Sequence, residues 1–171
     1  MERQKYLRRL RELIKDYGSQ NVVYFDESGF VSHKGRLSGW AKKGKKLYAN
    51  VKGKREPRTN LLMVQRGKDW LAPLVFTGSC TGKTVTIWLE RFLLKELQKP
   101  SIIIMDNAPV HNKKAIRSLL KMHGHALLPL PPYSPDFNPI EQSFGAMKKR
   151  REGMPVNSNI EDLIMSYSKV K

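Results

Sequence analysis

The chain has 171 residues, the size of one ordinary domain, and 40% of them are hydrophobic, which is enough for a single core. Its 32 Lys and Arg residues against 15 Asp and Glu residues give a net charge of +17, which favours DNA, RNA or an acidic membrane as a partner. The sequence has no apolar run that could cross a bilayer, its N-terminus is too charged for a signal peptide, and its single cysteine, Cys80, excludes an internal disulfide, so we expect an intracellular, cytoplasmic protein.

Hydrophobic periodicity predicts helices and strands along the whole chain. In chain order these are a helix at residues 2–16, strands at 22–27, 60–65 and 72–76, a helix at 86–98, a strand at 102–105, a helix at 112–123, a strand at 126–130 and a helix at 140–150. We expect residues 1–20 to be a linker helix and residues 21–171 to be one domain. The order predicts an α/β fold, an RNase H-like mixed sheet flanked by helices.

Three acidic residues occupy related places in this order. Asp26 and Asp106 end predicted buried strands, and Glu141 lies on the first turn of the last helix. Because sites in open α/β sheets form at the carboxyl ends of strands, we expect the three carboxylates to share one pocket. Phosphodiester cleavage can use two Mg²⁺ ions about 4 Å apart, and Mg²⁺ prefers carboxylate oxygen. A single Asp at a strand end is more often a cap or turn residue, so the prediction depends on all three acids converging.

Basic residues gather in two segments that we expect to bind nucleic acid. Residues 34–58 are rich in Gly and Lys and predict basic hairpin loops, and a solvated loop face is the alternative. Basic residues also follow Glu141 on its helix, close enough to hold phosphates. The candidate nucleic-acid-binding residues are Lys34, Arg36, Trp40, Lys42, Lys43, Lys45, Lys46, Lys52, Lys54, Arg55, Lys148, Lys149, Arg150 and Arg151.

One further segment, GSCTGKT at residues 78–84, is similar to a phosphate-binding loop. That loop needs a glycine where this chain has Thr77, so the spacing is wrong by one residue. We therefore expect Gly82 and Lys83 to form a turn between a strand and a helix, and Cys80 to be structural.

Four motifs together resemble one known family. They are DESGF at residues 26–30, GW at 39–40, DNAPVH at 106–111 and LPPYSPDFNPIE at 130–141. In order and context they resemble mariner-related transposases of bacterial insertion sequences, over roughly residues 22–151. That family places 34 residues between its second and third acids, as here between Asp106 and Glu141 (141 − 106 − 1 = 34).

The resemblance implies a DDE catalytic domain whose catalytic residues are Asp26, Asp106 and Glu141. These residues would hold two Mg²⁺ or Mn²⁺ ions, with Asp26 shared by both. The enzyme would cleave DNA at transposon ends and join the freed 3′-hydroxyl to target DNA. Because the family inserts at TA dinucleotides, the resemblance implies a TA target. Asn107 and His111 would line the site, and Asn138 would help to present Glu141.

The resemblance also implies partners. DNA would be bound as transposon ends and as target, and a homodimer is expected because two ends must be joined. Members of the family carry an N-terminal helix-turn-helix domain that recognises the transposon ends, and the residues before Val22 are too few to form one. An upstream partner or a missing domain would then recognise the ends. The resemblance also implies a prokaryotic cell. Two alternatives stay open: another RNase H-like nuclease, and a catalytically inactive DNA-binding fragment.

Overall fold

The computed structural model describes residues 1–31, 40–46, 58–108, 112–155 and 158–168. The predicted residues Lys34, Arg36, Lys52, Lys54, Arg55 and His111 lie outside these ranges. The described elements are α1 (Glu2–Tyr17), η1 (Ser19–Asn21), β1 (Val22–Phe30), β2 (Thr59–Arg66), β3 (Asp69–Thr77), α2 (Gly82–Trp88), η2 (Leu89–Leu93), α3 (Leu94–Glu96), β4 (Ile102–Met105), α4 (Lys113–Met122), β5 (Ala126–Pro129), η3 (Pro135–Phe137), α5 (Pro139–Glu152) and α6 (Ile160–Ser168).

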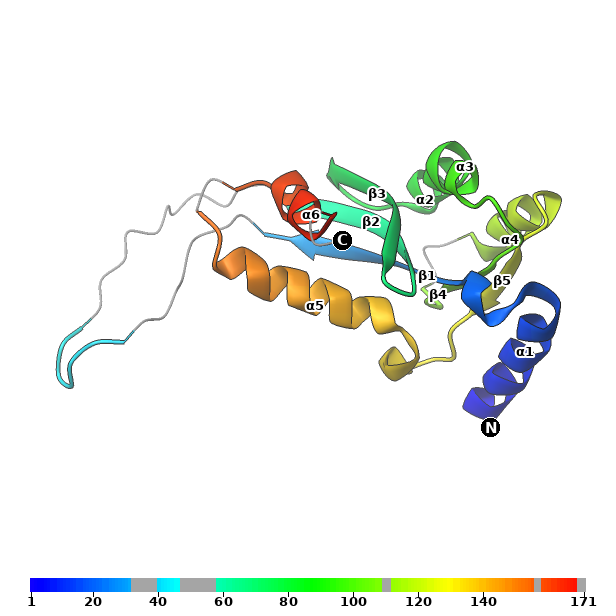
Figure 1. The fold of residues 1–171 in the computed structure, drawn as a ribbon, viewed down its shortest axis with the longest axis horizontal. Helices are drawn as coiled ribbons and strands as arrows, with labels where there is room; N and C mark the ends of the chain where they lie inside the picture. The colour runs from blue at the N-terminus through cyan, green and yellow to red at the C-terminus, as the bar shows by residue number, and fades with distance from the viewer. Residues whose placement is uncertain (32–39, 47–57, 109–111, 156–157, 169–171) are drawn as a thin grey trace.

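Within the described residues five strands form one mixed sheet in the order β3-β2-β1-β4-β5. β1 pairs antiparallel with β2, and β2 pairs antiparallel with β3. On its other side β1 pairs parallel with β4, which pairs parallel with β5. Figure 1 shows this sheet between helices, which confirms the predicted RNase H-like α/β fold.

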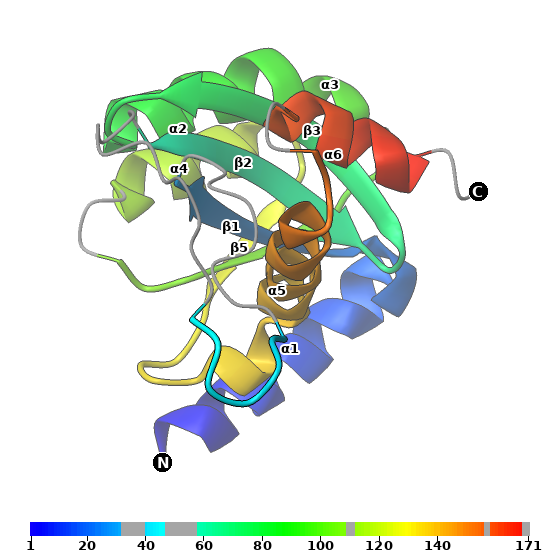
Figure 2. The ribbon, with the colours of Figure 1, turned by 90° about the vertical axis from the view of Figure 1, so that its left-hand side faces the viewer.

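Helices cover both faces of the sheet because side chains alternate along each strand. On one face, Val23 and Phe25 pack with side chains of α2, η2 and α4, including the fully buried Trp88. On the other face, one cluster joins Phe30 and Met63 to α5 and α6. A second cluster there joins β4 and β5 to α1. The result is three layers, with α1, α5 and α6 on one side and α2 to α4 on the other (Figure 2).

The prediction that the first strand ends at Asp26 and Glu27 is wrong. β1 continues to Phe30, because the residues beyond Asp26 pair with β2, from Asp26 opposite Met63 to Phe30 opposite Thr59. Asp26 therefore lies in the middle of β1. It nevertheless lies beyond the residues that pair with β4, whose described pairing stops at Tyr24.

The turn predicted at Gly82 and Lys83 is also wrong. Gly82 begins α2, because the Thr81 hydroxyl accepts a hydrogen bond from the Thr84 amide and the Thr84 side chain accepts one from the Thr81 amide. This reciprocal cap satisfies two amides at the start of the helix. The helical stretch ends at Glu96 rather than at the predicted residue 98, and α6 was not predicted.

Candidate active site

The register of β1 and β4 places two of the acids side by side. Val22 pairs with Ile102 and Tyr24 with Ile104, an offset of 80 residues that also separates Asp26 from Asp106 (102 − 22 = 106 − 26 = 80). Neighbouring strands lie about 4.8 Å apart. Alternation along the strands directs both acids to the face that α1 and α5 cover, since Tyr24 and Ile104 pack there.

Glu141 reaches this region from the first turn of α5. Ile140 and Phe144 are buried with Met63 in the cluster beneath the helix. Glu141 itself is exposed, and its amide donates a hydrogen bond to the carbonyl oxygen of Asn138 (3.1 Å). α5 therefore holds Glu141 at its N-terminal end, open to a large substrate.

Electrostatic coupling joins the three carboxylates. Burial, and after it the negative charges of Asp106, Glu141 and Glu27, together raise the pKa of Asp26 from 3.8 to about 7. A hydrogen bond from the Glu27 amide to Asp26 Oδ1 (2.7 Å) opposes the rise. A raised carboxylate pKa means that a negative charge is disfavoured at this place, and a bound cation would relieve that disadvantage.

Asn138 lines the site, and one of its polar atoms has no partner. Its side chain is 2% exposed, and its Nδ2 donates to Asp26 Oδ2 over 3.4 Å. Its Oδ1 is buried and accepts no hydrogen bond from the residues that the structure describes. A buried amide oxygen without a donor is unfavourable, so this atom is suited to a cation or to water held beside Asp26.

The donors at this site are carboxylate and amide oxygens, which suit Mg²⁺ or Mn²⁺. In the described ranges, no three His, Cys, Asp or Glu side chains are grouped so that they could hold an ion. Among the described residues, Asp26, Asp106 and Glu141 are therefore not placed to bind a single ion together. Two ions that share Asp26 need only the pairs Asp26 with Asp106 and Asp26 with Glu141.

Glu27, the neighbour of Asp26, belongs to the opposite face of the sheet. It pairs with Leu62, whose side chain packs in the cluster under α2 and α4. There it forms a hydrogen bond with Cys80, and burial first and then Glu27 raise the pKa of that thiol to about 12. Cys80 is thus a protonated, unreactive thiol, as expected of a structural cysteine.

Asn107 follows Asp106 but makes its described contacts with α4. Lys113 Nζ donates to the carbonyl oxygen of Asn107 (3.0 Å) and to its Oδ1. The Ala108 amide donates to Asp106 Oδ1 (3.3 Å). Sequence reasoning missed Lys113, although a basic residue on the first turn of the helix after Asp106 was a visible signal.

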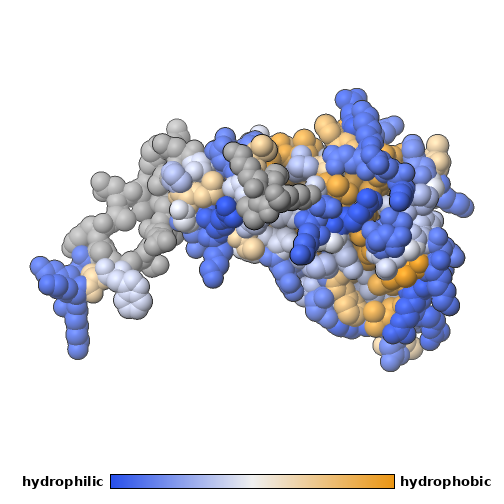
Figure 3. All heavy atoms as spheres, viewed as in Figure 1, coloured by the Kyte–Doolittle hydropathy of each residue, from blue (hydrophilic) through white to orange (hydrophobic). Residues whose placement is uncertain are grey.

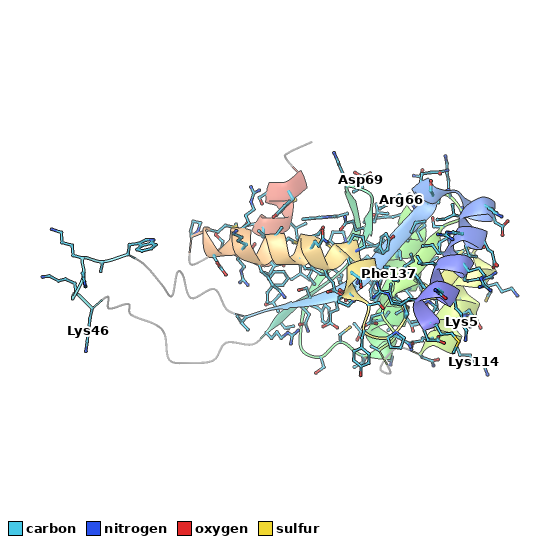
Figure 4. The ribbon with its side chains drawn as sticks, turned by 90° about the horizontal axis from the view of Figure 1, so that it is seen from below. Lys5, Lys46, Arg66, Asp69, Lys114 and Phe137 are labelled. Atoms are coloured by element: carbon cyan, nitrogen blue, oxygen red, sulfur yellow. The ribbon has the colours of Figure 1, made fainter. Side chains whose placement is uncertain are left out.

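Several predicted nucleic-acid-binding residues are exposed. Residues 40–46 lie at one end of the molecule, away from the sheet, where Trp40 is fully exposed and Lys46 projects (Figures 1 and 4). Mostly hydrophilic side chains cover this tip and much of the visible face (Figure 3). The exposed members of the predicted set are Trp40, Lys42, Lys43, Lys45, Lys46, Lys148, Lys149 and Arg150. No described contact tests whether they bind DNA, so that role stays a prediction.

Two arginines of α5 have contacts within the protein. The Arg150 guanidinium lies 4.8 Å from the centre of the Tyr167 ring. Arg151 is half-buried, donates to the carbonyl oxygen of Val31 (2.8 Å) and lies 5.7 Å from the centre of the Phe30 ring. Arg151 therefore ties α5 to the end of β1, whatever it also does with DNA.

The sequence matches a known family model over most of its length. The family model described as "DDE superfamily endonuclease" matches residues 21–164. No curated protein matches the chain in sequence. None of the described helices is long and apolar enough to span a membrane.

Three solved structures are similar in fold. A pre-cleavage Mos1 transpososome has a TM-score of 0.75 and 19% identity, covering 99% of this chain and 55% of that one. The mariner Mos1 paired end complex with Mg has a TM-score of 0.75 and 19% identity, covering 99% and 54%. The catalytic domain of Mos1 mariner transposase has a TM-score of 0.62 and 18% identity, covering 98% and 78%. The chain thus spans about half the length of the first of these proteins.

Proposed function

This chain belongs to the DDE superfamily of endonucleases, and we propose that it is the catalytic domain of a transposase, which cleaves DNA at transposon ends and joins the freed 3′ end to target DNA. The observation that supports this most strongly is the coupling of Asp26, Asp106 and Glu141. These acids come from two adjacent strands and a helix, yet the negative charges of the other two raise the pKa of Asp26. The likeness to Mos1 structures supports the fold on which such a site is built.

We propose that Asp26, Asp106 and Glu141 hold two Mg²⁺ or Mn²⁺ ions, with Asp26 shared between them. When bound, such a pair of ions supplies activation of the attacking oxygen and stabilisation of the leaving oxygen. Asn138 orients Asp26 through the hydrogen bond from its Nδ2, and its unpartnered Oδ1 would accept a hydrogen bond from a water molecule beside Asp26. A bound ion would offset the unfavourable ionisation of the half-buried Asp26 carboxyl.

DNA is the proposed substrate, and charge supports it. The net charge of +17 attracts a polyanion, while the acids are gathered at one place on that basic molecule. The exposed lysines of residues 40–46 and of α5 would hold phosphates on either side of the reacting bond. Insertion at TA sites is the finer part of the proposal and follows from the motif resemblance.

A homodimer and a separate end-reading domain complete the proposal. Joining two transposon ends needs two active sites, and the similar solved proteins include paired end complexes. The chain spans about half of those proteins, so the recognition of terminal repeats is assigned to an upstream partner or domain.

The test uses two DNA substrates with Mg²⁺ or Mn²⁺. Nicking of a supercoiled plasmid needs no end recognition, and labelled DNA with the element's own terminal repeats tests cleavage and strand transfer. We compare the chain with Glu141→Gln and with Glu152→Gln, a matched change of an exposed glutamate on the same helix. We expect Glu141→Gln to abolish metal-dependent cutting with DNA affinity unchanged, and Glu152→Gln to cut normally.

Other results would favour the alternatives. Cleavage of the RNA strand of a hybrid without strand transfer would favour another RNase H-like nuclease on the same fold. Salt-sensitive binding with no metal-dependent cutting of either DNA would favour an inactive DNA-binding fragment. Equal cutting by Glu141→Gln and the unchanged chain would refute the assignment of the acids.

A further inference from the structure

The turn that precedes the catalytic helix is held by the first helix of the chain. Arg3 of α1 and Asp136 of η3 lie 133 residues apart in sequence, but both terminal nitrogens of Arg3 donate to the two carboxylate oxygens of Asp136, with a distance of 3.1 Å from Nη1 to Oδ1. The Arg3 guanidinium also lies 4.3 Å from the centre of the Phe137 ring. Tyr6 stacks on the same ring at 5.3 Å. Figure 4 shows Phe137 where the start of α5 meets α1.

These contacts are strong enough to fix the turn because several act on the same two residues. The ion pair is about half exposed at both ends and contributes little alone. The aromatic contacts add to it, since Tyr6 is buried and Phe137 packs against the cluster that joins α1 to β4 and β5. The hydrogen bond from Arg3 also lowers the pKa of Asp136 below its ordinary value.

The other end of η3 leads directly to the acids. The amide of Phe137 donates to the carbonyl oxygen of Ser134 (3.1 Å), and that of Asn138 donates to the carbonyl oxygen of Pro135 (2.9 Å), so the turn is closed. The Asn138 side chain then donates a hydrogen bond to Asp26, and the main-chain carbonyl oxygen of Asn138 accepts a hydrogen bond from the amide of Glu141. A shift of Phe137 would therefore move Asn138, the next residue, and Glu141, whose amide is bonded to Asn138.

We infer that Arg3 and Tyr6 are positioning residues for the active site: by holding Asp136 and Phe137, α1 sets the place of Asn138 and Glu141 relative to Asp26. α1 thus supports the site instead of serving only as a linker. The inference deepens the proposed function, because its consequence for metal binding rests on the acids holding Mg²⁺ or Mn²⁺.

The test compares Arg3→Ala with Arg9→Ala in the full chain. Arg9 makes an equally exposed ion pair on the same helix, but with Glu12 of that helix (2.9 Å), so its loss does not reach η3. The readouts are the NMR chemical shifts of the Asn138 side-chain amide without metal, and the dissociation constant for Mn²⁺, measured from the electron paramagnetic resonance signal of free Mn²⁺. Arg3→Lys is the conservative variant, since it keeps the charge opposite Asp136.

We expect Arg3→Ala to move the Asn138 amide signals and to weaken Mn²⁺ binding by roughly threefold to tenfold. Arg9→Ala should leave both unchanged, and Arg3→Lys should recover part of the Mn²⁺ affinity. Unmoved Asn138 signals, or a Mn²⁺ dissociation constant equal to that of the unchanged chain, would overturn the inference.

Failure of the proposed function would be seen separately. If the unchanged chain binds Mn²⁺ and Asp26→Asn abolishes that binding, the acids hold the metal, and an unaffected Arg3→Ala then refutes only the role of α1. If Asp26→Asn binds Mn²⁺ as well as the unchanged chain, the metal site itself is wrong and the inference about metal affinity fails with it.

Discussion

Replacing Asp26 by Asn should make the metal-free protein more stable while abolishing its activity. Burial raises the pKa of the Asp26 carboxyl from 3.8 to about 7, so ionising it in the folded protein is unfavourable. The difference between these two pKa values, at about 1.4 kcal/mol for each pH unit, gives the free-energy cost of ionising Asp26 in the folded protein. Above pH 7 this cost has an upper bound of about 4 kcal/mol. The side chain is only partly buried and its surroundings can relax, so we expect the free energy of unfolding to rise by roughly 1 to 3 kcal/mol.

The same reasoning fixes the pH dependence. The folded protein has the higher pKa, so this group's stabilisation is full below pH 3.8 and is lost as the pH rises through about 7. Asparagine does not titrate, so the stability difference between variant and parent should be small near pH 4 and should level off above pH 7. Where Asp26 is ionised, the variant has a further advantage, because the Asn138 amide can turn its unpartnered Oδ1 toward the new side chain and accept a hydrogen bond from its N–H.

The measurement is urea unfolding in the presence of a chelator at several pH values from 4 to 8. A gain of 1 kcal/mol corresponds to about 2–4 °C in melting temperature for a domain of this size. Asp16→Asn, which changes an exposed aspartate of α1, should shift stability by less than about 0.5 kcal/mol. Added Mg²⁺ at pH 8 should stabilise only the parent. Equal or lower stability of Asp26→Asn at pH 8 would refute the argument.

Three further substitutions test other parts of the structure. Burial lowers the pKa of His125, whose Nδ1 accepts a hydrogen bond from the Ser101 amide, so the folded protein should lose stability as the pH falls below about 6.5. His125→Gln should reduce this loss, measured as the difference in the free energy of unfolding by urea between pH 7 and pH 5. Arg151→Ala removes the hydrogen bond to Val31 and should lower the free energy of unfolding by about 1 kcal/mol. An unchanged free energy of unfolding would mean that Arg151 does not stabilise the fold. Tyr133→Asn should raise it by roughly 0.5–1 kcal/mol, because Tyr133 is 99% exposed at φ 52 and asparagine tolerates that conformation; a loss would mean that the ring has a partner.

The parts of the site that lie on regular structure could be predicted from sequence. Asp106 follows four apolar residues, and Glu141 follows a proline on the first turn of a helix, so both patterns are local. The continuation of β1 past Asp26 could not be predicted, since Asp, Glu, Ser and Gly disfavour strands and only pairing with β2 holds them there.

The side-chain contacts that tie distant segments to the site could not be predicted from the sequence. Nothing near Arg3 in the sequence indicates Asp136, and nothing near Asn138 indicates that its amide meets Asp26. The start of α2 was missed for a different reason: Gly82 and Lys83 are typical of turns, and the reciprocal cap formed by Thr81 and Thr84 outweighs that preference. Local pattern thus predicts the elements, whereas tertiary packing decides which side chains meet.

The strand order has a consequence for how the protein gains its activity during folding. The paired residues of β2 and β3 lie 3 to 18 positions apart and those of β1 and β2 lie 29 to 41 positions apart, whereas those of β1 and β4 lie 80 positions apart. The entropic cost of closing a loop grows with its length, so we expect the pairing of β1 with β4 to form after the other two. Asp26 and Asp106 are brought together only by that late pairing, and Glu141 only when α5 has been synthesised and docked. We therefore expect a nascent or half-folded chain to bind DNA through its charge without being able to cut it.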